Sequence, residues 1–279
     1  LLDNKKIIDS KLLSDSFGIN CLKIVNEDNK KFIVKYYHNK KYEFNAIKSE
    51  INNLIFYNNK NFNFFPRIIN NNDYLVIMSF IDNNNNQPNK INDDLLEAII
   101  SLHSKNSINY GFDFDTQIGG LRQINSYSKN WVEFYRDKRL FYIFDLINKK
   151  LPMDSAINTK INLLLKKMDN FIPNNPKPSL LHGDLWEGNI LFKNKNFSGF
   201  IDPGSFYGHN ELEVSYLRWF DPKFIDKNFL DRYNDYISIN KNYLEYEPIY
   251  QLYYSLLNVY LWDRSFVNNV HNLLERIKI

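Results

Sequence analysis

The chain has 279 residues, of which 35 are basic and 32 acidic, so its net charge is only +3. With lysines and arginines spread along the chain, this balance does not favour nucleic acid or an acidic membrane, and we expect neither as a partner. No run of about 18 apolar residues is present, so no membrane-spanning helix is expected either.

The first part of the chain predicts a small β-rich unit. Residues 3–14 have the apolar spacing of a short amphipathic helix. Two strands joined by a polar turn follow at Cys21–Val25 and Lys31–Tyr37, and helical spacing then extends over Tyr42–Tyr57. Two further apolar runs predict strands at 65–69 and 74–81.

An asparagine-rich tract, Asp82–Pro88, is typical of a solvated connector, and it predicts a boundary between residues 1–82 and 83–279. Helices are predicted beyond it at 93–104, 129–148, 157–170, 211–219 and over most of 223–277. The only strands predicted there are Ile190–Phe192 and Phe197–Ile201. This order of elements predicts an α+β fold of two lobes, with a small β-rich N-terminal lobe and a larger helical C-terminal lobe.

Glycines mark the stretch most suited to a functional site. Glycine is the default residue where the backbone needs a positive φ or must let a ligand approach closely. Only nine are present, and five fall within 26 residues: Gly183, Gly188, Gly199, Gly204 and Gly208.

The same stretch holds two aspartates and an asparagine at a spacing typical of kinases. Asp184 follows His182-Gly183, Asn189 stands five residues later, and Asp202 ends an apolar strand 18 residues after Asp184. In the kinase template the first Asp accepts the proton of the acceptor hydroxyl. The Asn and the second Asp hold the metal ions on the ATP phosphates. An ordinary loop capped by short polar residues is the alternative, and the combined spacing favours the kinase.

The wider sequence resembles the fructosamine (ketosamine) kinase family, within the aminoglycoside-phosphotransferase and protein-kinase-like superfamily. The resemblance is carried by His182–Trp186 and Gly188–Phe192, and it continues at Ile201–Pro203, Tyr207–His209 and Glu211. An earlier segment is also similar, at Ile118–Gly119, Gln123, Asn125, Trp131, Phe134 and Arg139–Leu140. The resemblance implies a bilobal protein-kinase-like fold, ATP and Mg²⁺ as cofactors, and phosphorylation of a ketosamine on the third carbon of its sugar. In that family phosphorylation frees the amine, which is a deglycation repair.

The resemblance also assigns the nucleotide side of the site. It implies that Lys35 binds the ATP phosphates and that Glu50, 15 residues later, holds this lysine, with Glu43 as the competing partner. Gly18 lies in the nucleotide loop, where Phe17 and a single glycine stand in place of the usual glycine pair. The hinge is expected at three residues whose backbone groups would bind adenine, Met78, Ser79 and Phe80.

The acceptor side is implied less directly. Trp186, two residues after Asp184, is the tryptophan expected to touch the sugar, while Trp131 and Trp219 are expected in the core. His209 and Glu211 are expected on the substrate side or in a structural role, and a catalytic or metal-binding His209 is disfavoured. Glu187 either touches a second metal or faces solvent, and solvent is favoured.

Two other functions remain open. The acceptor could be another small alcohol, such as an aminoglycoside, choline or homoserine, or the chain could be a pseudokinase that only binds nucleotide. The second is disfavoured because all five kinase positions are filled. From Asp221 to Ile279, eight acids stand against seven bases. Such a near-neutral segment suits a sugar with one amine better than a polycationic aminoglycoside.

Cys21 is the only cysteine, so neither an intrachain disulfide nor a cysteine-based zinc site is expected. This composition suits a reducing compartment, and we expect a cytoplasmic protein. The first ten residues carry charged side chains in place of the apolar run of a signal peptide. A disulfide between two copies is disfavoured, and a monomer is expected rather than a dimer.

Overall fold

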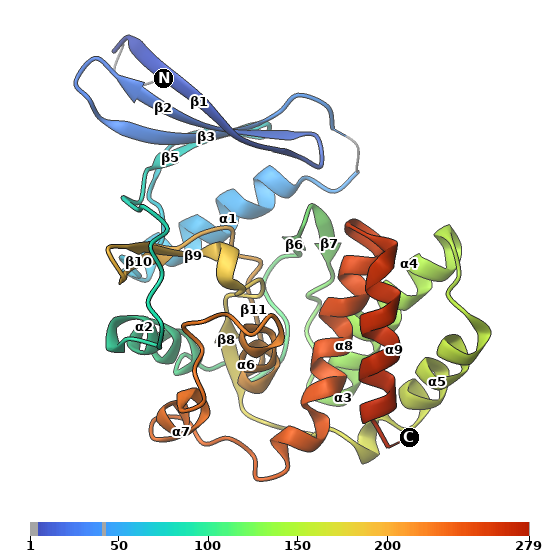
Figure 1. Cartoon of the computed structure of the whole chain (residues 1–279). Coiled ribbons are helices and arrows are strands. Elements are labelled where there is room, and N and C mark those ends of the chain that lie inside the picture. The colour runs from blue at the N-terminus through green and yellow to red at the C-terminus, as the bar shows by residue number, and fades with distance from the viewer. Residues whose placement is uncertain (1–4, 41–42, 279) are drawn as a thin grey trace.

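The computed structural model describes residues 5–40 and 43–278, and its front part is a five-stranded antiparallel sheet beside one helix (Figure 1). The strands are β1 (Ile7–Ser16), β2 (Ile19–Asn26), β3 (Lys31–Tyr37), β4 (Ile68–Asn72) and β5 (Leu75–Ser79), in the spatial order β1-β2-β3-β5-β4. The helix is α1 (Ala46–Asn59). The strands predicted around Cys21 and Lys31 and the following helix are therefore confirmed, and Tyr42 lies outside the described residues.

The helix predicted at residues 3–14 is wrong. Residues 3 and 4 lie outside the described part of the chain, and the rest of the segment belongs to β1. Its pairing with β2 is irregular at two places, between Ile7 and Asp9 and between Leu12 and Ser14. Each irregularity breaks the strict alternation of side chains along a strand. The apolar residues therefore come as doublets, a spacing that also fits a helix.

Helix α1 joins the sheet to the rest of the molecule. Asn45 caps it, because its side chain accepts a hydrogen bond from the N–H of Lys48 (3.0 Å). Ile47, Leu54 and Tyr57 at helical spacing are fully buried in the main hydrophobic core. This core is continuous from α1 into the helical part, which fixes the sheet against it.

The helical part contains most of the remaining chain (Figure 1). Its α-helices are α2 (Asp93–His103), α3 (Trp131–Tyr135), α4 (Tyr142–Lys150), α5 (Ser155–Lys166), α6 (Asn210–Trp219), α7 (Phe229–Asn234), α8 (Tyr243–Leu261) and α9 (Val267–Arg276). A π-helical segment, Arg136–Phe141, joins α3 to α4, and 3₁₀ turns lie at Met168–Asn170, Glu187–Asn189 and Arg264–Phe266. The α+β class, with a β-sheet front and a helical remainder, is confirmed.

Three short two-stranded ribbons lie within the helical part. They are β6 (Thr116–Ile118) with β7 (Leu121–Gln123), β8 (Pro178–Leu181) with β11 (Phe206–His209), and β9 (Ile190–Lys193) with β10 (Asn196–Phe200). The β9–β10 hairpin was predicted, but the expectation of no other strand in this part is wrong. Strands of three or four residues are too short for alternation to reveal them.

The asparagine tract forms neither helix nor strand, but it is fixed in place. The N–H groups of Asn84 and Asn85 both donate to the carbonyl of Phe192, and Lys195 donates to the carbonyl of Asn86. The segment thus runs along the β9–β10 hairpin, and a lobe boundary after residue 82 stays a prediction. No helix within residues 5–40 and 43–278 is long and apolar enough to cross a membrane.

Candidate active site

The loop after β8 carries Asp184 into a cleft. Leu181 at the end of β8 is fully buried, and Gly183 then takes a positive φ of 87°. A Cβ at Gly183 would lie 2.0 Å from the carbonyl oxygen of Gly204, so only glycine lets the two loops pass this closely. Asn189 Nδ2 donates to the carbonyl of Asp184 (2.8 Å) and to its Oδ2 (3.2 Å). The predicted meeting of Asp184 and Asn189 is confirmed.

Lys35 connects the sheet to the second aspartate. Its Nζ donates to Glu50 on α1 (2.8 Å) and also to Asp202, which follows β10. The expected ion pair of Lys35 with Glu50 is therefore present, and Glu43 is not its partner. Lys35, Glu50, Asp184, Asn189 and Asp202 all line one cleft of about 300 Å³.

Burial and charge perturb both ends of this cluster. Burial and then the nearby charge of Asp202 raise the pKa of Asp184 to about 7. Burial alone would lower the pKa of Lys35, but the carboxylates of Asp202 and Glu50 outweigh it and raise that pKa. Lys35 is therefore a permanent cation, while Asp184 is balanced between its two protonation states near neutral pH.

The donor atoms in the cleft fit magnesium only with help from a ligand. Within the described residues, no three His, Cys, Asp or Glu side chains gather closely enough to hold a metal. Asn189 and Asp202 offer amide and carboxylate oxygens, which Mg²⁺ prefers, and the Asp202 side chain is 37% exposed. Mg²⁺ is often held by one or two such groups together with substrate phosphates, and the pair fits that arrangement.

Glu213 on α6 anchors the loop that carries Asp184, and the sequence did not single it out. It is fully buried, and its carboxylate accepts hydrogen bonds from the backbone N–H groups of His182 (3.0 Å) and Gly183 (2.7 Å). It also pairs with Nε2 of His103 on α2 (2.9 Å). The available signal was an acid between two apolar residues of a helix, Leu212 and Val214.

Tyr216, one turn further along α6, was missed as well. Its hydroxyl donates to Oδ1 of Asp184 (3.3 Å), and its ring stacks on Tyr254 of α8 at 3.5 Å. The Asp184 carboxylate thus lies between a phenol and the Asn189 amide, and both orient it.

The nucleotide loop is the tight turn between β1 and β2. Gly18 has a φ of 77°, and a Cβ there would lie 1.6 Å from the carbonyl oxygen of Asn39. The carbonyl of Gly18 accepts hydrogen bonds from the N–H groups of His38 (3.0 Å) and Asn39 (3.2 Å). The turn is therefore tied to the end of β3, and Phe17 beside Gly18 lines the cleft.

The hinge residues lie at the end of β5. Met78 pairs with Ile33 of β3 and with Ile68 of β4, and the N–H of Ser79 donates to the carbonyl of Arg67 (2.8 Å). Phe80 lies beyond the strand, and within the described residues no hydrogen bond engages its backbone. The Phe80 end of the predicted hinge therefore has free backbone groups.

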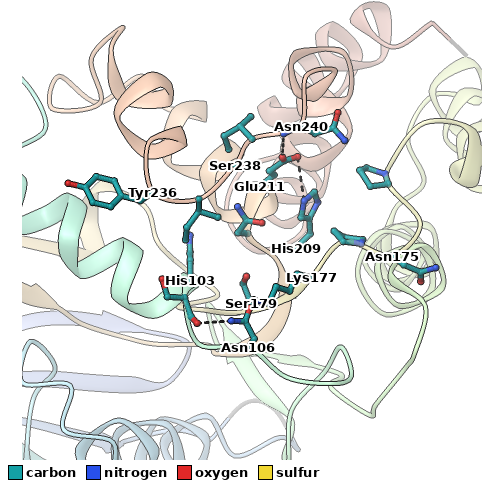
Figure 2. Close-up of a pocket in the computed structure, with 16 residues that line it drawn as sticks. His103, Asn106, Asn175, Lys177, Ser179, His209, Glu211, Tyr236, Ser238 and Asn240 are labelled. Carbon is teal, nitrogen blue, oxygen red and sulfur yellow. Dashed lines mark hydrogen bonds and ion pairs between the residues drawn. The ribbon is translucent and has the colours of Figure 1, made fainter.

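His209 and Glu211 do not line the cleft. In the β8–β11 ribbon His209 lies opposite Pro178, at the end away from Leu181 and Asp184. Figure 2 shows the two residues in a second pocket, of about 660 Å³, together with Asn240. This corrects the expectation that they face the substrate, because closeness in sequence to Asp202 carries them along β11 to the far end of the ribbon.

Both residues are held by buried partners. His209 Nδ1 contacts the Tyr250 hydroxyl (2.8 Å), and burial and the charge of His103 lower its pKa to about 3. Glu211 accepts hydrogen bonds from the N–H of Asn240 (2.6 Å) and the hydroxyl of Tyr246. These contacts join β11 and α6 to α8 and the segment before it, which is a structural role.

The tryptophans separate as expected. Trp131 is fully buried, and its Nε1 donates to the Tyr250 hydroxyl (2.8 Å). Trp186 is 36% exposed and lines the cleft beside Asp184. Its ring lies over Gly188, where a Cβ would come within 2.4 Å of it. Glu187 is half-buried, and it is not among the residues that line the cleft.

These elements together define a protein-kinase-like fold: a sheet bearing a lysine held by a helical glutamate, above a helical part with Asp, Asn and Asp. Solved structures agree. A candidate fructosamine-3-kinase from Thermobifida fusca matches with a TM-score of 0.85 and 19% identity, over 99% of this chain and 95% of that one. The ternary complex of streptomycin, ATP and APH(2″)-IIa has a TM-score of 0.63 at 15% identity, over 97% and 92% of the two chains.

Sequence comparison narrows the class to one family. The fructosamine kinase family model matches residues 11–279, and the chain belongs to that family. The chloroplastic protein-ribulosamine 3-kinase of Arabidopsis thaliana is 33% identical over 208 residues, which are 72% of this chain and 60% of that protein. The matched region spans 60% to 65% of the length of three curated relatives. The resemblance inferred from the motifs is confirmed.

Proposed function

We propose that the protein is an ATP-dependent kinase that phosphorylates the third-carbon hydroxyl of the sugar in a ketosamine. The observation that carries this proposal is the meeting of Lys35, Glu50, Asp184, Asn189 and Asp202 in one cleft. Family membership and the name of the Arabidopsis relative support a ketosamine acceptor. The ATP complex of a phosphotransferase with the same fold supports ATP as the donor.

Asp184 is the proposed base. Its carboxylate orients the sugar hydroxyl for in-line attack on the γ-phosphorus and takes up the proton as the new O–P bond forms and ADP departs. A pKa of about 7 suits this task near neutral pH. The hydrogen bonds from Tyr216 and Asn189 hold the carboxylate in one orientation, so that one oxygen can face the acceptor.

Lys35 is the proposed phosphate ligand. Its ammonium group pairs with Glu50 and Asp202 in this structure, and phosphate oxygens would replace Asp202 while Glu50 retains the lysine. Asn189 and Asp202 would hold Mg²⁺ together with the phosphates, where the ion neutralises charge that develops on them. Adenine would bind the free backbone groups at the Phe80 end of the hinge.

Phosphorylation of the sugar would destabilise the ketosamine and release its amine, which is a repair of glycated amines. We also propose a monomer in a reducing, cytoplasmic setting, on the single cysteine and the even charge balance. The plant relative is named as chloroplastic, and that location is a property of that protein.

The test is ATP consumption against a panel of fructosyl- and ribulosyl-amines, choline, homoserine and kanamycin, with Asp184→Asn as the control. Turnover of ketosamines that the variant loses supports the proposal. Turnover of another acceptor alone would replace the substrate. ATP binding without turnover of any acceptor would favour a pseudokinase.

A further inference from the structure

Phe17 reaches from the nucleotide loop across the cleft to the helical part. Its ring meets that of Trp262, just after α8, edge to face with 5.0 Å between the ring centroids. Both rings line the same cleft as Asp184 and Trp186. In Figure 1 the β6–β7 hairpin rises toward the sheet beside the end of α8, so this is where the front and back of the molecule meet.

Two glycines at the tip of that hairpin make room for the Phe17 ring. A Cβ at Gly120 would lie 3.0 Å from Cβ and 3.2 Å from Cγ of Phe17. A Cβ at Gly119 would lie 2.9 Å from a methyl group of Leu261 on α8. The hairpin tip and the end of α8 thus form a receiving surface for a bulky residue on the nucleotide loop.

The backbone of Phe17 supports the same conclusion. Its φ is 55°, a left-handed conformation that bulky residues rarely adopt. Gly18 anchors the turn from behind through His38 and Asn39, so Phe17 is directed into the cleft. Such strain persists where surrounding contacts compensate for it, and here the contacts are Trp262 and the glycine pair.

We propose that the Phe17–Trp262 bridge is a specificity element that admits free ketosamines and disfavours ketosamines attached to a folded protein. The inference rests on the proposed function. The cleft volume of about 300 Å³ is at the small end for ligand sites, and the bridge bounds it beside Asp184 and Trp186. A free sugar-amine fits beneath two aromatic rings. A sugar on a protein lysine brings a protein surface against the rim, so the bridge must open first.

The bridge is a modest barrier, because one aromatic pair is worth a factor of roughly 3 to 10 in an equilibrium. Trp262 is 61% exposed even in contact with Phe17, so solvent already reaches its other side. Removing either ring should therefore raise kcat/KM for a protein-bound ketosamine, relative to the free one, by roughly 3- to 10-fold.

The test compares kcat/KM for free fructosyl-lysine with that for a folded protein glycated by the same sugar, at saturating ATP. The variants are Phe17→Ala, Trp262→Ala, their double variant, and Tyr236→Ala as a matched control. Tyr236 is a 64% exposed aromatic residue on the second pocket. Any change in ATP binding caused by Phe17→Ala affects both acceptors equally and cancels in the ratio.

We expect the ratio of protein-bound to free substrate to rise in each single variant, to rise no further in the double variant, and to stay unchanged in Tyr236→Ala. A ratio unchanged in either single variant, or raised equally in the control, overturns the inference while leaving the kinase assignment intact. Absence of turnover with both ketosamines in the wild type would refute the proposed function, and the inference with it.

Discussion

Replacing Glu213 with Gln should destabilise the fold by about 3 kcal/mol and slow phosphotransfer. The fully buried carboxylate accepts two backbone hydrogen bonds, from His182 and Gly183, and pairs with His103. Gln has nearly the same shape but only one acceptor oxygen. Its NH₂ group must therefore face one of the two backbone N–H groups.

The expected cost has two parts. One buried N–H loses its acceptor, which costs about 1–3 kcal/mol, and the remaining hydrogen bonds lose their charge assistance, about 1 kcal/mol more. His182 and Gly183 directly precede Asp184, so the base moves with their loop. Because a displacement of about 1 Å can cost about 10²-fold in rate, we expect kcat to fall by roughly 10- to 100-fold.

The effect should also depend on pH. Burial raises the pKa of Glu213, but the hydrogen bond and charge of His103 outweigh it, and the pKa is lowered overall. A carboxyl with a lowered folded-state pKa contributes stability that is present above its unfolded pKa, about 4.3, and is lost as the pH falls through the folded value. The stability gap between wild type and variant should therefore be widest near neutral pH and narrow below about pH 4.

Urea unfolding at several pH values measures the gap, and ATP consumption with a ketosamine measures kcat at a temperature where both proteins are folded. Glu245→Gln is the matched control, because Glu245 is exposed on α8 and should change stability by less than about 0.5 kcal/mol. Equal stability of wild type and Glu213→Gln at neutral pH, with kcat unchanged, would refute the reasoning.

Three further predictions concern the cleft itself. Asp184→Asn should lower kcat by roughly 10²–10⁴-fold with ATP binding retained, and near-normal turnover would remove Asp184 as the base. Because the pKa of Asp184 is raised to about 7, the wild type should lose stability from about pH 4 to 7 relative to this variant, measured by thermal unfolding without nucleotide or divalent cations; a difference independent of pH contradicts the raised pKa. Asp202→Ala should abolish the magnesium-dependent part of the thermal stabilisation by ATP, and an unchanged shift would put the metal elsewhere. A fructosyl- or ribulosyl-amine should have a higher kcat/KM than kanamycin, and the reverse order would reject a ketosamine substrate while leaving the kinase standing.

Local patterns sufficed for the parts of the site that lie within one loop or one strand. Asp184 and Asn189 are five residues apart, so their meeting follows from the loop alone. Lys35 and Glu50 come from adjacent elements, β3 and α1, and helical spacing placed the glutamate. In each case the chain between the partners is short and regular, so spacing carries spatial information.

The parts that failed depend on how distant segments pack. Glu213 and Tyr216 reach the Asp184 loop from a helix about 30 residues later, and their roles appear only once α6 lies behind β8. His209 misled for the opposite reason, because it follows the Asp202 segment closely in sequence while β11 carries it to the far end of the ribbon. The spacing along the chain does not show where a strand leads.

Helix α1 explains how the two charged ends of the cleft stay in register. Glu50, Asn53 and Tyr57 recur at helical spacing and share one face. Glu50 holds Lys35 of the sheet (2.8 Å), while Asn53 Oδ1 accepts from the N–H of Ser205 (3.1 Å) and the Tyr57 hydroxyl contacts its Oγ (2.5 Å). Ser205 lies three residues after Asp202, so one helix face fixes both the lysine and the loop of its second carboxylate. A tilt of α1 would therefore disturb Lys35 and Asp202 together, whereas a change at either end alone would leave the other in place.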